Sequence, residues 1–141
     1  MLNRRHLRIK VLQVLYAFFQ GHENDAHKVE KELLLSIERM YDMYLYLLIA
    51  LPELQRAAQN RQAELKKKMR PSEEDLHPNM KFVDNQLITE LSAHAGLYKL
   101  AEQRKVNWLG AENQEMFKKM YMHLLDTEMY FEHMNNGAEG T

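Results

Sequence analysis

The sequence predicts an all-α fold, a bundle of about five to seven helices that forms one domain over residues 1–134. Five Gly and three Pro in 141 residues leave few of the turns that a strand-rich fold needs. Good helix formers, above all Leu, Met, Ala, Glu, Lys, Gln and Arg, dominate the composition. Apolar residues recur every three or four positions and never alternate over the length of a strand, which indicates helices throughout.

A basic helix is predicted over residues 4–20. Asn3 is a suitable N-cap, and Gly21 suits the position after the last turn. A polar connector over 21–26 then separates this helix from the next one. One face of the basic helix is apolar and is formed by residues spaced at three and four positions, Leu7, Val11, Leu15 and Phe18.

The middle of the chain predicts two helices and a loop. A long helix over 27–50 carries two apolar rows, so it should contact several other helices. Pro52 should end or kink that helix and start the next one, over 52–69. An acidic loop over 70–79, with Pro at 71 and 78, separates this part from the rest.

The last part predicts further helices over 80–134. Asn79 should cap the first of them, Trp108 should lie in a turn before Gly110, and Thr127 should restart the final helix after a small break. Residues 135–141 are predicted to be a disordered tail.

Catalysis finds little support in the sequence. The chain has no Cys, which removes thiolate nucleophiles and Cys-based metal sites, and its seven His lack the spacing of metal ligands. A glycine-rich phosphate loop and a nucleophile elbow are also missing. The chain is therefore predicted to be neither an enzyme nor a metal or cofactor protein. It also lacks a long apolar run and a signal-peptide cleavage site, which favours the cytoplasm.

Charge is distributed unevenly along the chain. Residues 1–20 hold four bases and no acid, whereas the rest holds the other 15 bases and all 20 acids. A cationic end on an acidic body favours contact with a polyanion, and Arg recognises phosphate with two parallel hydrogen bonds. The candidate RNA-binding residues are Arg4, Arg5, Arg8, Lys10 and, for base contacts, Gln13. A second candidate basic patch comprises Lys66, Lys67, Lys68 and Arg70.

Chemistry alone leaves two alternatives open. The first is a helical protein-interaction module with Met-rich grooves, and the second is a peripheral membrane protein anchored by the amphipathic first helix. Phe18 and Phe19 distinguish these functions, because their burial favours RNA or protein binding and their outward display favours lipid. Tyr16 is expected to pack on the apolar side near Phe19.

The segment Asn3–Tyr16 resembles the start of the NusB transcription antitermination proteins, which typically reads Arg-Arg-x-Ala-Arg-x-x-Ala-Leu-Gln-x-Leu-Tyr. Leu7 and Val11 depart from this pattern, because the family usually has Ala there. Segments 41–48 and 81–88 look like the expanded form of the family in Bacteroidetes. The residues that match the opening pattern are Arg4, Arg5, Arg8, Gln13, Leu15 and Tyr16.

The resemblance implies an RNA-binding antitermination factor that grips single-stranded boxA-like RNA together with a NusE-type small-subunit ribosomal protein. The complex would help RNA polymerase to ignore terminators in ribosomal RNA operons. The family's usual second half has no counterpart after Asn79, so we expect these residues to be the N-terminal part of a longer chain. We also expect an exposed apolar face, with Leu7 and Val11 near its edge, through which the chain self-associates.

Overall fold

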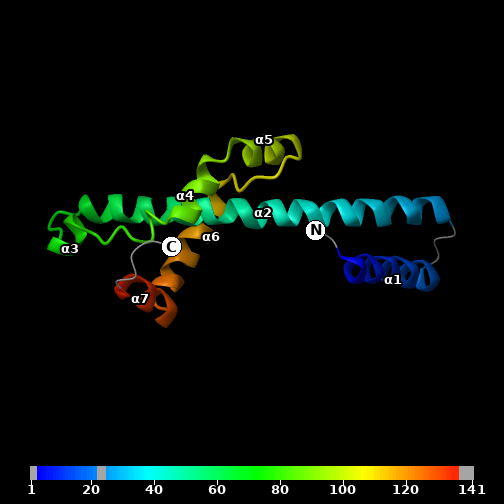
Figure 1. Ribbon diagram of the computed structural model, residues 1–141, viewed down its shortest axis with the longest axis horizontal. Helices are drawn as coiled ribbons and strands as arrows, with labels where there is room; N and C mark the ends of the chain where they lie inside the picture. Colours follow the sequence, from blue (N-terminus) through cyan, green and yellow to red (C-terminus); the bar gives the residue numbers. More distant parts are fainter. Residues whose placement is uncertain (1–2, 22–24, 137–141) are drawn as a thin grey trace. The chain divides into compact units, whose positions relative to one another are not determined.

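The computed structural model describes residues 3–21 and 25–136, and most of these residues are α-helical. Seven helices and no strand occur in these ranges, which confirms the predicted all-α class (Figure 1). The chain divides into two compact units, residues 1–44 (unit 1) and 45–141 (unit 2). Helix α2 contributes its first part to unit 1 and its remainder to unit 2.

Unit 1 contains helix α1, Arg4–Gln20, and the start of α2, Ala26–Lys66. The bounds of α1 are those predicted from its caps. The Asn3 side chain accepts a hydrogen bond from the His6 N–H at 3.0 Å, and the Gly21 N–H donates to the Ala17 carbonyl at 2.8 Å. Helix α2 begins directly after Asp25, one residue earlier than predicted; residues 22–24 of the predicted connector lie outside the described ranges.

The predicted break at Pro52 is wrong, because α2 runs through it as one helix of 41 residues. The predicted helices 27–50 and 52–69 are therefore continuous, and the helix ends at Lys66. Proline inside a helix costs about 3 kcal/mol through one lost hydrogen bond and a steric clash. Burial of Pro52 itself, together with tertiary contacts of α2 on either side of it, offsets that cost.

The predicted acidic loop 70–79 contains one short helix, α3, Glu73–Leu76. Ser72 caps it in a reciprocal pair of hydrogen bonds with Asp75. The predicted cap at Asn79 is also wrong. The next helix begins only at Gln86, with Asn85 as its N-cap, because residues 80–85 form a turn that carries Val83 into the core.

Four helices complete unit 2: α4, Gln86–Ala93; α5, Ala95–Gln103; α6, Ala111–Leu125; and α7, Glu128–Asn135. Trp108 lies in the turn between α5 and α6, and Thr127 caps α7, both as predicted. The predicted start of the tail 135–141 is wrong, because Asn135 belongs to α7; residues 137–141 lie outside the described ranges.

Unit 2 has a hydrophobic core of two clusters. The first cluster joins α2 to α5 and to the turn that follows α5, through buried Leu45, Ile49, Leu97, Ala101 and Val106. The second joins α2 to α6 and the turn before α4, through buried Ala58, Val83 and Tyr121. Phe117 is 1% exposed and packs edge-on against Trp108, with ring centroids 5.4 Å apart. Unit 2 therefore has a core of its own, built from its fully buried apolar side chains.

Candidate nucleic-acid interface

The basic side chains of α1 are largely accessible. Arg4, Arg5 and Arg8 are exposed, as is Gln13, and Lys10 is half-buried. Within the described ranges, no carboxylate forms an ion pair with any of these bases. All five predicted contact residues lie on one helix, and the charges of its three arginines are exposed.

Helix α1 has an inner and an outer face. Its half-buried side chains, among them Leu7, Val14 and Phe18, recur at the spacing of one helix face. The outer face displays large apolar side chains: Leu12 and Tyr16 are each 67% exposed, and Phe19 is 77% exposed. None of the residues of α1 is fully buried.

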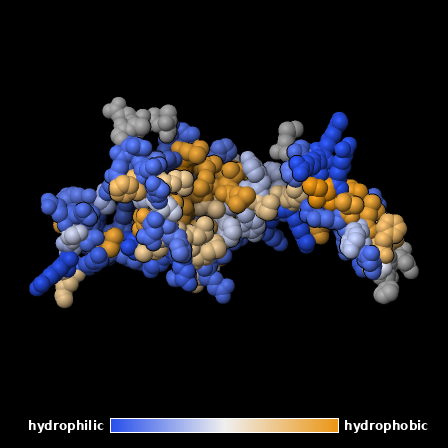
Figure 2. All heavy atoms as spheres, turned by 90° about the horizontal axis from the view of Figure 1, so that it is seen from below, coloured by the Kyte–Doolittle hydropathy of each residue, from blue (hydrophilic) through white to orange (hydrophobic). Residues whose placement is uncertain are grey.

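The outer face combines guanidinium groups with aromatic rings. Arg5, Leu12, Tyr16 and Phe19 follow one another at intervals of seven, four and three residues, so they form one stripe along the helix. Arg8 stands beside this stripe. Figure 2 shows hydrophobic side chains gathered over α1 next to strongly hydrophilic ones. The arrangement can hold phosphates on its cations and unpaired bases on its rings.

Tyr16 was expected to pack against the bundle, and that expectation is wrong. The sequence contained the signal that places it correctly. Tyr16 lies 11 and 8 residues after Arg5 and Arg8, which is three turns and just over two turns of helix, so it shares their face. Its proximity to Phe19 was informative, but both rings point outward.

The second basic patch is less available. Lys66, Lys67, Lys68 and Arg70 are exposed at and after the end of α2. However, the Lys68 ammonium pairs with the Asp75 carboxylate at 3.3 Å. The Ser72 backbone N–H, which donates a hydrogen bond to the Asp75 carboxylate, lowers the pKa of Asp75 most, and the Lys68 contact lowers it further. The acids of α3 therefore partly neutralise the patch.

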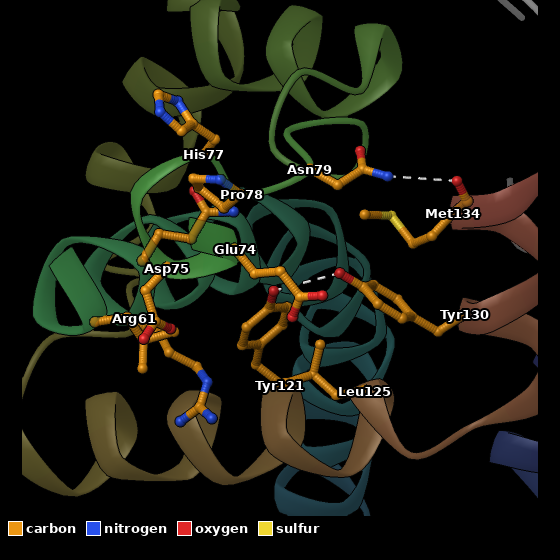
Figure 3. A pocket seen from close by; sticks show the side chains of 12 residues that line it. Arg61, Glu74, Asp75, His77, Pro78, Asn79, Tyr121, Leu125, Tyr130 and Met134 are labelled. Carbon is orange, nitrogen blue, oxygen red and sulfur yellow. Dashed lines mark hydrogen bonds between the residues drawn. The ribbon is translucent and has the colours of Figure 1, made fainter. Parts of the chain in front are cut away.

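Unit 2 also contains a mixed pocket of about 480 Å³ between α2, the 74–79 segment, α6 and α7 (Figure 3). Two contacts join groups that line it: the Tyr121 and Tyr130 hydroxyls are 3.4 Å apart, and the Asn79 amide donates to the Met134 carbonyl at 3.4 Å. Burial, and then the Tyr121 hydroxyl, raise the pKa of Tyr130. We interpret this pocket as structural.

Two further properties concern the described part of the chain. It contains no group of three or more His, Asp or Glu side chains placed to hold a metal ion. None of its helices combines the length and the apolar character that crossing a bilayer requires.

The chain has no significant match among protein-family models, curated proteins or solved structures.

Proposed function

We propose that this chain binds single-stranded RNA through α1 and acts in transcription antitermination on boxA-like RNA, together with a NusE-type ribosomal protein. The observation that carries the proposal is the set of three exposed arginines, Arg4, Arg5 and Arg8, without a carboxylate partner in the described residues. An acid-free cationic helix has little reason to exist for stability, because cations at a helix N-terminus oppose the helix dipole.

The mechanism is assembly without turnover chemistry. Arg4, Arg5, Arg8 and Lys10 neutralise phosphates, which gives affinity and a strong dependence on salt. Unpaired bases stack on the exposed rings of the outer face, and Gln13 on the same helix offers an amide to a base edge. The ribosomal-protein partner and RNA polymerase then complete the complex on the transcript.

The stacking role of the outer face is tested by replacing Phe19 with Ala and measuring affinity for a boxA-like RNA oligonucleotide by fluorescence anisotropy. Stacking of one base on an aromatic ring is worth about 1–3 kcal/mol, so we expect a loss of about fivefold or more. The matched control is Phe131→Ala in unit 2, where the residue is 67% exposed, against 77% for Phe19. Equal affinities for the two variants would contradict the proposal.

A second candidate function is peripheral binding to an anionic membrane surface. Of the two rings that distinguish lipid from RNA or protein binding, Phe19 is displayed outward, as lipid binding requires, whereas Phe18 is half-buried. Arg rather than Lys at three of the four basic positions, and an exposed Gln13 among them, favour RNA. Co-sedimentation with phosphatidylserine vesicles, in competition with the RNA oligonucleotide, separates the two functions.

A further inference from the structure

Helix α7 covers one side of the pocket in unit 2 with only two side chains. Tyr130 and Met134 are half-buried and line the pocket, whereas the other residues of α7 are exposed. The two positions are one helical turn apart, so they lie on the same face of α7. Figure 3 shows both side chains reaching from α7 toward the pocket. None of the residues of α7 is fully buried, so the helix holds to the rest of unit 2 by a narrow contact.

This helix is too short to be stable by itself. It has eight residues, and isolated helices shorter than about 12–15 residues are marginal in water. The Tyr130 ring packs against Phe82, with centroids 5.7 Å apart, and against Tyr121 at 6.4 Å. Met129 and Phe131 are 70% and 67% exposed and add little to this contact. The helical state of α7 therefore depends on the groups that hold its two ends.

The beginning of α7 is held by its neighbours in the chain. Residues 126–127 alone separate it from α6. The Thr127 hydroxyl donates to the Leu124 carbonyl at 2.7 Å and accepts from the Tyr130 N–H at 3.3 Å. Because these contacts join residues close in sequence, they do not fix the position of the other end of α7. Residues 126–127 are thus placed as a hinge.

The end of α7 is held by a distant segment. The last carbonyl groups of a helix lack partners within it. The Lys81 ammonium donates to the carbonyls of His133 and Asn136, and the Asn79 amide donates to the Met134 carbonyl. Asn79 also accepts from the Lys81 N–H at 3.0 Å, which shapes the turn that carries both side chains. A cation at this end suits the helix dipole as well.

We propose that α7 is a strap that opens and closes over the pocket independently of the core of unit 2, and that Lys81 keeps it closed. Opening takes place about the hinge at residues 126–127. Tyr130 and Met134 then leave the pocket wall, the Tyr121 ring becomes accessible to solvent, and the pocket becomes an open groove. Loss of the Lys81 ammonium shifts the equilibrium toward the open state, because two carbonyls at the end of α7 lose their donor.

Native-state hydrogen exchange of the full chain, followed by NMR in increasing urea, tests the strap. The amides of residues 132–136 should exchange well before those of Phe117 and Tyr121 in α6. Their exchange should depend little on urea, because opening of α7 exposes little surface. Lys81→Met should accelerate exchange in α7 about tenfold, the effect expected from a lost hydrogen bond to a charged group, and leave α6 unchanged.

Three further variants sharpen the test. Lys81→Arg retains the charge and the donors, so it should keep most of the protection of α7. Lys99→Met removes an exposed lysine of α5 and should change exchange in neither helix. Asn79→Ala removes the donor to the Met134 carbonyl and should accelerate exchange in α7 about twofold to fivefold. Circular dichroism of each variant verifies that unit 2 is folded.

Three results would overturn the proposal. If the α7 amides of the unchanged chain share the urea dependence of Tyr121, then α7 unfolds only together with the core. If Lys81→Met leaves exchange in α7 unchanged, then Lys81 does not keep the strap closed. If Lys81→Met accelerates exchange in α6 as much as in α7, then Lys81 stabilises the core of unit 2 and the strap has no equilibrium of its own.

Discussion

The two units of this chain differ in how far they bury the apolar faces of their amphipathic helices. Unit 2 holds every fully buried apolar side chain of the described residues, although some of its other apolar side chains, such as Phe131, stay exposed. Unit 1 has no fully buried residue among those described, and it displays aromatic rings and unpaired arginines. Apolar surface left exposed beside unpartnered charge is typical of a binding surface. We therefore interpret unit 2 as the stable part of the chain and unit 1 as the part that recognises ligands.

The largest difference in unfolding free energy should be seen between two Phe→Ala variants, one in each unit. Phe117→Ala removes a ring that is 1% exposed, so the free energy of unfolding should fall by about 3–5 kcal/mol. Phe19→Ala removes a ring that is 77% exposed, and the change should stay within about 0.5 kcal/mol. Urea denaturation followed at Trp108, which lies in unit 2, measures both. A comparable loss in the two variants would mean that the units share one core.

Two Gln→Ala variants, one in each unit, should also differ in their effect on the free energy of unfolding, but by less than the two Phe→Ala variants. The Gln55 amide donates to the Val83 carbonyl at 2.6 Å and accepts from the Ser92 hydroxyl at 3.2 Å, and its side chain is buried. Gln55→Ala removes the donor to the Val83 carbonyl, whereas the Ser92 hydroxyl keeps the Ile88 carbonyl as an acceptor at 2.9 Å, and the change should cost about 1–3 kcal/mol of unfolding free energy. Gln13 is exposed on α1, so Gln13→Ala should leave thermal stability nearly unchanged and should weaken RNA binding only.

Alkaline pH should affect unit 2 through Tyr130. Burial raises the pKa of this phenol, so the folded chain holds the proton more tightly than the unfolded chain does. The stabilisation is complete below the ordinary tyrosine pKa near 10, and it is lost as pH rises through the higher folded value. Unfolding midpoints measured between pH 8 and pH 11 should fall above about pH 10. Tyr130→Phe should reduce this fall, and a fall of equal size in that variant would contradict the assignment.

The sequence predicted local features of the fold better than tertiary ones. Asn3 and Gly21 fixed both ends of α1, because caps act on neighbouring backbone groups. Pro52 misled, since the packing that keeps α2 continuous comes from residues far along the chain. Asn79 misled in the same way, since the helix starts only after Asn85 and the intervening turn places Val83 in the core.

For the candidate site, too, the sequence predicted some features and missed others. The cationic residues of α1 could be identified from their charge alone, and the structure leaves them accessible. The aromatic part was missed, because the prediction placed Tyr16 by its proximity to Phe19, although its helical spacing from Arg5 puts it on the exposed face. The sequence suggested that the charges of the second basic patch are free, but the Lys68 ammonium forms an ion pair with the Asp75 carboxylate across the turn that follows α2.

The salt dependence of RNA affinity tests most directly whether unit 1 is the recognition unit. Two triple variants are compared: Arg4, Arg5 and Arg8 to Gln in α1, and Lys66, Lys67 and Arg70 to Gln at the end of α2. Each phosphate contact on a single strand contributes about 0.7 to the slope of log affinity against log salt concentration. The α1 variant should therefore flatten the slope by about two units, while the other variant retains it. An unchanged slope in the α1 variant, with a flattened slope in the other, would contradict the account and place RNA binding in unit 2.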